Sequence, residues 1–206
     1  MNSWIRGNYD GIGLTQSPPG PYLAKVQARF GGTVLLCIDV SGSMTGGPLT
    51  GAVEGGLLFL EEAAAAHYRA GLVLWDHEIQ LYLPPGAPPA DLAAGLREAR
   101  PSGGTDLVPV LLKCQELLVP LDGDRVVCVF SDGGIGRRDE ARALARELCA
   151  AGVRIVVRGL GADAAGALAE LACPGRDDAR QVVVDVGGVS AGIASMASGL
   201  TRGARR

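Results

Sequence analysis

The chain has 206 residues, of which 48% are hydrophobic and 20% are charged, so it can bury a core and is not an intrinsically disordered protein. Its formal net charge of -3 argues against a nucleic-acid-binding or membrane-surface protein. No apolar run reaches the roughly 18 residues that a membrane helix needs. The first residues, MNSWIRGNYDGIG, lack the apolar stretch of a secretory signal.

The cysteines indicate the cellular compartment. They are Cys37, Cys114, Cys128, Cys149 and Cys173, an odd number without C-x-x-C spacing. Cys37 and Cys128 lie inside apolar runs of strand length, where a reduced thiol behaves as a small hydrophobic side chain. We therefore expect five free thiols and a cytoplasmic location, and a shortfall of titratable thiols would argue against that compartment.

The two ends of the chain differ in composition from its middle. Residues 1–28 are rich in Gly, Pro and polar residues, and their SPPGP stretch is typical of a rigid turn or an extended linker. We expect this segment to be an arm or linker that packs on one domain, residues 29–202. Residues 203–206 form a short basic tail that we expect to be solvated.

The domain opens with a strand pattern followed by a helix pattern. TVLLCIDV is a continuous apolar run of strand length that ends at SGS. Pro48 suits the first turn of a helix, and apolar residues then recur at helical spacing from Leu49 to Ala64. GLVLW and IQLYL predict two strands of a hairpin around Asp76, and a hairpin in an otherwise parallel sheet marks an antiparallel edge strand.

The rest of the domain alternates in the same way. Helices are expected over residues 91–100 and, with Pro109 in the first turn, over residues 107–118. RVVCVF, VRIVV and VVVDV predict three further strands separated by two helices, and a last amphipathic helix runs through Met196. Strands that are apolar on both faces and alternate with helices indicate an α/β fold, with a doubly wound, mostly parallel sheet covered on both sides.

Hard oxygen donors follow the ends of two of these strands. They are Asp39, Ser41 and Ser43 where TVLLCIDV runs out, Thr105 in a glycine-flanked loop, and Asp132 after RVVCVF. Ligands of such sheets bind outside the carboxyl ends of the strands, so these side chains meet on one rim if the two strands are neighbours. Two carboxylates and three hydroxyls favour Mg²⁺, with Mn²⁺ or Ca²⁺ as alternatives, over zinc.

Such a site would leave room for a ligand from another molecule. Mg²⁺ takes about six oxygen ligands and gives up its waters reluctantly, so a site with few charged protein ligands keeps positive charge and an open position. An Asp or Glu side chain of a partner protein can fill that position. The helix amino terminus after the first loop would favour the same anion.

Three motifs follow one another along the chain: D-x-S-x-S, then G-T-D in a loop, then an apolar strand that ends in S-D-G. This order resembles the von Willebrand factor A family and its metal-ion-dependent adhesion site. The resemblance implies that Ser41 and Ser43 bind the metal through their hydroxyls. It also implies that Asp39 holds the metal directly or through water, that Thr105 ligates or approaches it according to conformational state, and that Asp132 acts through water. No position of the motif is missing.

The resemblance covers roughly residues 30–202 and implies a Rossmann-like sheet with one antiparallel edge strand. The short segment SGSMTGGPLTGAVEGG resembles stand-alone bacterial intracellular members, including those of tellurium-resistance and stress systems. Others of that kind work beside MoxR-type AAA+ ATPases. In those settings the domain is a docking module and not an enzyme, so we expect a protein partner that presents Asp or Glu, and no nucleic-acid or membrane partner.

Other functions stay open at this point. In a structural subunit, the metal would only hold the loops. Gly159 to Ala164 satisfies G-x-G-x-x-[GA] after a strand, with Asp178 and Asp185 downstream, as in dinucleotide-binding enzymes, although a glycine-rich strand-to-helix turn explains this pattern more simply. Metal-dependent phosphate chemistry is disfavoured because no GK[ST] occurs and Ser41 stands where aspartate-nucleophile phosphatases carry a second aspartate.

Overall fold

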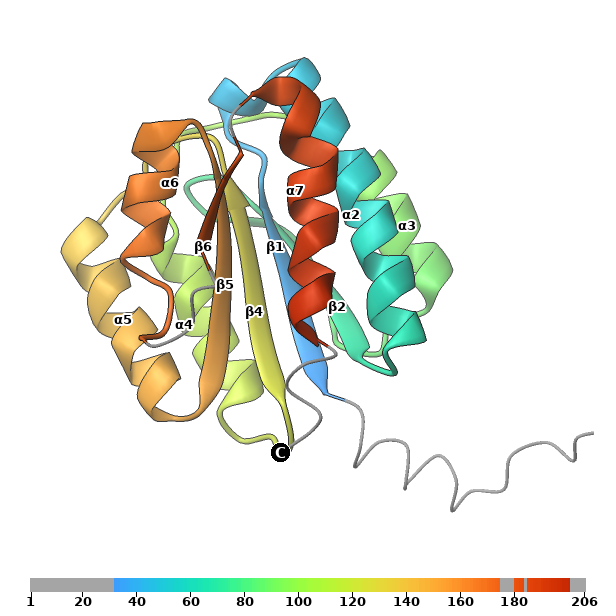
Figure 1. Ribbon diagram of the computed structural model, residues 1–206, viewed down its shortest axis with the longest axis vertical. Coiled ribbons are helices and arrows are strands. Elements are labelled where there is room, and N and C mark those ends of the chain that lie inside the picture. Colours follow the sequence, from blue (N-terminus) through green and yellow to red (C-terminus); the bar gives the residue numbers. More distant parts are fainter. Residues whose placement is uncertain (1–31, 175–179, 184, 201–206) are drawn as a thin grey trace, which may run out of the picture.

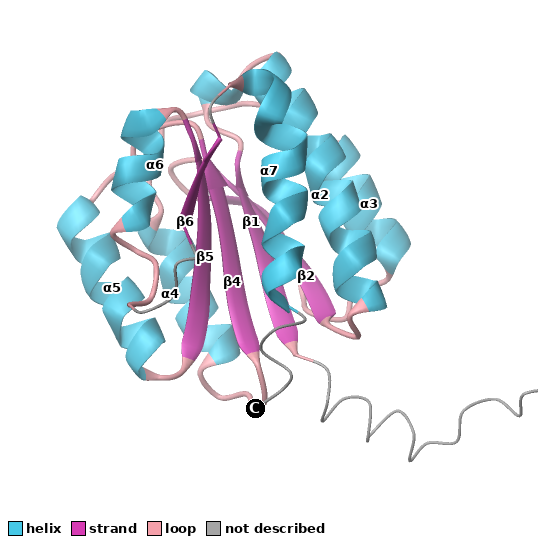
Figure 2. Cartoon of the chain, in the orientation of Figure 1, coloured by secondary structure: helices cyan, strands magenta, loops and turns pink. Residues whose placement is uncertain are grey.

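The computed structural model describes residues 32–174, 180–183 and 185–200. In this part of the chain a six-stranded sheet has the order β3-β2-β1-β4-β5-β6, and helices cover both of its faces (Figure 1; Figure 2). Neighbouring strands pair in parallel except for β3, which pairs with β2 in the antiparallel direction. The predicted α/β class, with a doubly wound sheet and one antiparallel edge strand, is confirmed.

The strands match the apolar runs of the sequence. They are β1 (Thr33–Asp39), β2 (Arg69–Trp75), β3 (Ile79–Leu83), β4 (Arg125–Ser131), β5 (Val153–Leu160) and β6 (Arg180–Val183). All seven residues of β1 are buried, because this strand lies in the middle of the sheet between β2 and β4. Its carboxyl end is therefore held on both sides.

The last predicted strand, VVVDV, is placed differently in the structure. β6 begins at Arg180 and ends at Val183, so it starts and stops earlier than the apolar run indicates. Asp185 instead precedes a short 3-10 helix, η3 (Val186–Gly188), and its Oδ1 accepts a hydrogen bond from the Gly188 backbone N–H at 2.9 Å. An aspartate that caps a turn in this way ends the strand before it.

Helices connect the strands and form one layer on each face of the sheet. On one face lie α2 (Gly47–Ala65), α3 (Pro89–Arg97) and α7 (Val189–Ser195), and on the other lie α4 (Val108–Leu118), α5 (Arg138–Ala150) and α6 (Ala162–Ala169). Figure 1 shows α7 alongside α2. Two further 3-10 turns, η1 (Gly42–Met44) and η4 (Met196–Gly199), precede α2 and extend α7.

Side chains of β1 divide alternately between two hydrophobic cores. Leu36 and Ile38 pack in the core under α2, α3 and α7, whereas Leu35 and Cys37 pack in the core under α4 and α5. This alternation follows from the period of two in a strand. Burial of each large apolar side chain contributes about 1.5–3 kcal/mol, so the position of β1 is strongly determined from both faces.

Two of the five cysteines form a disulfide, so the prediction of five free thiols is wrong. Cys149, at the end of α5, is bonded to Cys173, which follows α6, with 5.6 Å between their Cα atoms. Helices α5 and α6 pack on the same face of the sheet, and this packing brings together cysteines that are 24 residues apart. Cys37, Cys114 and Cys128 are buried free thiols, as expected. The disulfide removes one argument for a reducing compartment.

Several predictions concern parts that the structure does not test. The arm, residues 1–28, and the basic tail, residues 203–206, lie outside the described residues, so the domain boundaries stay predictions. Among the helices that are described, none combines the length and the apolar character that crossing a membrane requires.

Candidate metal site at the sheet edge

The carboxyl ends of β1 and β4 lie side by side. The two strands pair in parallel, with Ile38 opposite Phe130. The winding of the sheet reverses here, because β2 lies on one side of β1 while β4 and β5 lie on the other. Ligands of doubly wound sheets bind at such a reversal. The condition on which the predicted site depended, that the two strands are neighbours, is therefore met.

Asp39 is the innermost candidate ligand, and its side chain is fully buried. Oδ1 accepts a hydrogen bond from the Ser41 backbone N–H at 2.7 Å, and Oδ2 accepts one from the Ser131 hydroxyl at 2.5 Å. Burial, the largest effect, raises the pKa of this carboxyl to about 6, and the charge of Asp132 adds to the rise, whereas the hydrogen bonds lower it. A bound cation would compensate the negative charge that burial disfavours.

The hydroxyls and the second carboxylate continue from Asp39 towards solvent. The Oγ atoms of Ser41 and Ser43 lie 3.1 Å apart, and the Ser43 hydroxyl donates to Asp132 Oδ1 at 2.7 Å. Ser41 is buried, Asp132 is half-buried and Ser43 is exposed. The turn η1 holds Ser43 in this place because Met44, its last residue, is fully buried in the core. The structure thus brings four of the five candidate ligands into one continuous cluster of oxygen atoms.

Thr105, the fifth candidate, lies in the loop that leads to α4. The loop is held against the first motif, because the Gly42 N–H donates to the Gly103 carbonyl at 3.2 Å and the Ser102 N–H donates to the Val40 carbonyl at 2.7 Å. The Thr105 hydroxyl itself makes no hydrogen bond to another described residue. The structure therefore brings its loop to the rim but does not join its side chain to the other four.

Asp76, which the sequence placed in a hairpin, positions this loop. Its Oδ1 accepts hydrogen bonds from the Glu78 N–H and the Gln80 side-chain amide, both at 2.9 Å, and its Oδ2 accepts one from the Ser102 hydroxyl at 2.8 Å. Its carbonyl accepts a hydrogen bond from the Asp106 N–H at 2.8 Å. Burial acts to raise the pKa of Asp76, but the hydrogen bonds outweigh burial and lower it. This charged, buried acceptor ties the ends of β2 and β3 to the loop of Thr105.

Sequence reasoning missed three residues that support the site, although a signal for two of them was present. Asp76 directly follows β2, whose last residue pairs with Asp39, and Ser131 ends β4. A polar residue at the end of an apolar strand was the signal that identified Asp39 itself. Gly103 was also not singled out. Its φ is +63°, and a Cβ there would lie 2.5 Å from Asp76 Oδ2, so this position requires glycine.

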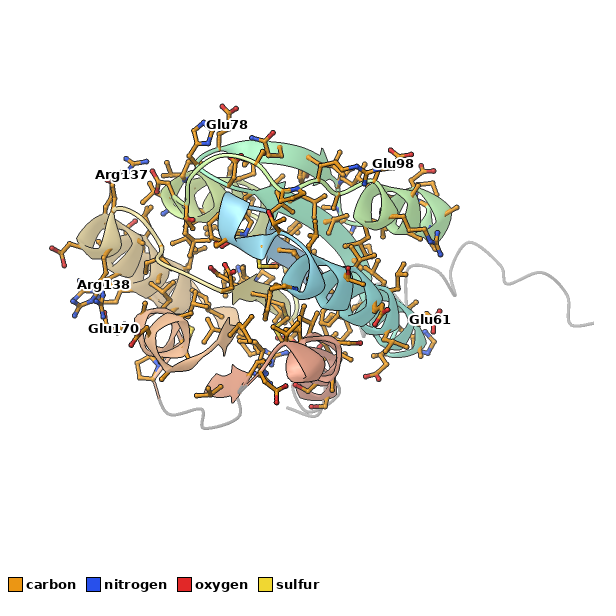
Figure 3. All side chains as sticks on the ribbon, turned by 90° about the horizontal axis from the view of Figure 1, so that it is seen from above. Glu61, Glu78, Glu98, Arg137, Arg138 and Glu170 are labelled. Carbon is orange, nitrogen blue, oxygen red and sulfur yellow. A yellow bond between two sulfur atoms is a disulfide. The ribbon has the colours of Figure 1, made fainter. Side chains whose placement is uncertain are left out.

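Charged side chains surround the rim, which Figure 3 shows from above the carboxyl ends of the strands, with Arg137 and Arg138 on one side and Glu78 on another. Arg137 Nε donates to Asp106 Oδ2 at 2.9 Å, and Arg138 is paired with Glu170. Because these arginines are already paired with carboxylates, they provide little free positive charge for an anionic partner.

The donor set fits a hard divalent cation. It offers carboxylate and hydroxyl oxygens without thiolate or imidazole, which favours Mg²⁺, Mn²⁺ or Ca²⁺. Within residues 32–174, 180–183 and 185–200, no group of three or more His, Cys, Asp or Glu side chains could hold a metal ion. A metal at the rim therefore depends on the hydroxyls as well as on Asp39 and Asp132. The metal-binding role of the five residues stays a prediction.

A family model described as von Willebrand factor type A domain matches residues 34–135. The matched segment is similar to that family and covers just under half of the chain. It runs from β1 to the residues just after β4, so all five candidate ligands lie within it. No curated protein matches the chain in sequence.

Solved structures share the fold at low sequence identity. The von Willebrand factor domain of the type V pili tip protein Mfa5 from Porphyromonas gingivalis has a TM-score of 0.71 at 14% identity, covering 85% of this chain and 97% of that one. A von Willebrand factor type A protein from Catenulispora acidiphila has a TM-score of 0.66 at 15% identity, covering 83% and 43%. Proximal thread matrix protein 1 from the mussel byssus, with a zinc-occupied MIDAS motif, has a TM-score of 0.63 at 14% identity, covering 81% and 46%. At these identities the likeness shows the fold alone, and the chain spans less than half of the last two proteins.

The glycine-rich turn after β5 has a packing explanation. A Cβ at Gly159 would lie 2.3 Å from the backbone nitrogen of Ala165, so α6 approaches the strand too closely for any other residue. Gly161 adopts a φ of +81° where α6 begins. Of the two downstream aspartates, Asp185 caps η3 and Asp178 lies outside the described residues. Close helix–strand packing therefore accounts for the pattern that resembled a dinucleotide-binding turn.

Proposed function

We propose that this domain is a divalent-metal-dependent protein-interaction module, which binds an Asp or Glu side chain of a partner through Mg²⁺. The observation that carries this proposal is the cluster of oxygen donors that runs from the buried Asp39 through Ser41 to the exposed Ser43 and to Asp132. A bound Mg²⁺ would supply positive charge and an open coordination position at the surface of the rim. Mn²⁺ or Ca²⁺ would suit the same oxygen atoms.

Under this proposal each candidate residue has a different role at the rim. Asp39 would provide buried negative charge, and Ser41 and Ser43 would offer hydroxyl oxygens without adding charge, so the cation would keep its attraction for an outside carboxylate. Thr105 would approach from its own loop, which Asp76 holds in place. None of these roles requires a bond to be made or broken, and we propose binding and not catalysis. The similar structures named above include a pilus tip protein and a byssus matrix protein, which supports this choice.

The setting of the interaction is proposed from the sequence resemblance alone. It is a bacterial stress or defence system, with a MoxR-type AAA+ ATPase or another component of the same system as the partner. The cytoplasmic location stays a prediction, and the disulfide between Cys149 and Cys173 counts against it. The net charge of -3 supports a protein partner over a nucleic acid.

Calorimetric titration with Mg²⁺ and Mn²⁺ tests the metal site by itself. The double variant Ser41→Ala, Ser43→Ala should lose at least about tenfold in metal affinity while keeping the circular dichroism spectrum of the wild type. Thr50→Ala is a matched control, because its exposed hydroxyl donates only to the Gly46 carbonyl, at 3.1 Å, in α2. Equal affinities in the wild type and the double variant would refute the metal site.

Affinity capture in Mg²⁺ or in EDTA tests the docking role. A partner retained in Mg²⁺ by the wild type and by Thr50→Ala, but lost in EDTA and with the double variant, would support it. Replacing the partner's contacting Asp by Asn, or Glu by Gln, should then abolish retention. A partner held equally in EDTA, together with metal-dependent stability, would favour the metal-stabilised structural subunit instead.

A further inference from the structure

An apolar groove lies between the second half of α2 and α3, at the end of the sheet opposite the metal rim. Leu57, Leu60 and Ala64 of α2 form one wall, and Leu92 and Ala93 of α3 form the other. The groove has a volume of about 440 Å³. The start of β2 lines it as well, so the groove opens at the amino ends of the strands. Apolar surface concentrated in one hollow is typical of a place that another segment covers.

The described part of the chain begins at this groove. The Arg69 N–H donates to the Gly32 carbonyl at 2.9 Å, and Thr33 pairs with Arg69 in the sheet. A Cβ at Gly32 would lie 2.1 Å from the ring of Tyr68, so the two residues are in direct contact. Tyr68 and Arg69 both line the groove. The first 31 residues of the chain are therefore attached directly beside it.

The sequence of that attached segment suits an apolar groove. Residues 24–30, AKVQARF, alternate strictly between apolar and polar positions, and Tyr22 and Leu23 precede them. The apolar positions are Ala24, Val26, Ala28 and Phe30. A period of two gives an extended chain one apolar side and one polar side. Pro18, Pro19 and Pro21, just before this stretch, also favour an extended backbone.

Charged residues of the groove can be compared with those of the attached segment. Glu61 lies in the wall on α2, on the outer surface of the helix layer in Figure 3. Among the described residues no ion pair is recorded for Glu61, and the polar side of the segment carries Lys25 and Arg29. With the apolar side in the groove, one of these cations can reach Glu61, whereas Arg69 and Arg97, which also line the groove, offer the segment no attraction.

We propose that residues 22–30 of this same chain lie in the groove between α2 and α3, with their apolar side against Leu57, Leu60 and Leu92. Attachment at Gly32 favours this occupant over any free partner, because the covalent link gives the segment a high effective concentration beside the groove. The interaction is independent of the metal rim, which lies at the other end of the strands. The segment thereby becomes part of the domain and covers the apolar groove between α2 and α3.

Hydrogen exchange of the full-length protein, read by mass spectrometry, tests this placement. Ala64 and Ala65 are adjacent exposed residues of α2, but only Ala64 lines the groove. In the wild type and in Ala65→Glu, amides of residues 22–30 should exchange at least about tenfold more slowly than in the free peptide. In Ala64→Glu that protection should be lost. An unprotected segment in the wild type, or equal protection in the two variants, would overturn the proposal.

Two controls keep the test decisive. If Ala64→Glu unfolds, as judged by circular dichroism, Ala93→Glu takes its place, with Ala94→Glu as its exposed neighbour outside the groove. Sedimentation at several protein concentrations separates this chain from a second copy. Protection that is constant in a monomer supports the proposal, whereas protection that grows together with a dimer assigns the groove to a second copy and overturns it.

Discussion

Replacing Asp39 by Asn should stabilise the metal-free domain and abolish its response to Mg²⁺. Burial raises the pKa of Asp39 from 3.8 to about 6, so the folded state disfavours its charge. The free energy by which folding disfavours the charged carboxylate is therefore about 3 kcal/mol, because the pKa differs by about two units and each unit corresponds to about 1.4 kcal/mol. Because the folded-state pKa is raised, the carboxyl's contribution to stability is complete below pH 3.8 and is lost as the pH rises through about 6. Asn keeps the shape without the charge.

Chemical denaturation in EDTA measures this effect. At neutral pH the variant should be more stable than the wild type by about 3 kcal/mol, and the difference should vanish near pH 3.8. Mg²⁺ at a hundredfold excess over its dissociation constant should stabilise the wild type by about 2.7 kcal/mol and leave the variant unchanged. Asp122→Asn, at an exposed position, should show neither effect. A variant that is no more stable at neutral pH, or that Mg²⁺ stabilises as much as the wild type, would refute the reasoning.

Three further substitutions test the framework of the site and of the fold. Asp76→Ala should lower the free energy of unfolding by about 2–4 kcal/mol, because three donors lose their buried acceptor, and should weaken Mg²⁺ binding in calorimetry. Cys149→Ser should lower it by about 3 kcal/mol without reductant, because the disulfide joins cysteines 24 residues apart. Gly159→Ala should lower it by about 1–3 kcal/mol in denaturant titrations, since its Cβ would lie 2.3 Å from the Ala165 nitrogen.

Each of these predictions has a control and a contrary outcome. Unchanged Mg²⁺ affinity in Asp76→Ala would mean that the loop of Thr105 does not depend on Asp76. A reductant should remove the difference between Cys149→Ser and the wild type, and equal stability before reduction would contradict the contribution of the disulfide. Gly166→Ala is the control for Gly159→Ala, because a Cβ at Gly166 meets open space, and a loss as large as at Gly159 would contradict the packing argument.

Much of the fold could be predicted because strand and helix patterns depend on near neighbours in the chain. The run that became β1 is apolar throughout, and the structure buries both of its faces. The hairpin around Asp76 predicted the antiparallel edge strand correctly. VVVDV was misplaced because an apolar run does not reveal that Asp185 will cap a turn and end the strand early.

The candidate site likewise combines features of one short stretch of sequence with contacts between residues that are far apart in the chain. The residue types at Asp39, Ser41 and Ser43 indicate hard-cation chemistry by themselves, since carboxylates and hydroxyls at alternate positions need only a local turn to converge. Their connection to Asp132 spans 89 residues and exists because β4 pairs with β1. The bond from Ser131 to Asp39 spans 92 residues and arises from the same pairing.

The sequence by itself therefore determined the α/β class, the central strand and the oxygen donors of the rim, because periodicity and side-chain chemistry are properties of short segments. Only the tertiary structure decided the neighbours of those donors, the role of Asp76, the pairing of Cys149 with Cys173 and the groove beside Gly32. The physical reason is that these features depend on which strands pair and which helices pack together. That choice is made by burial summed over the whole domain, which no single stretch of sequence contains.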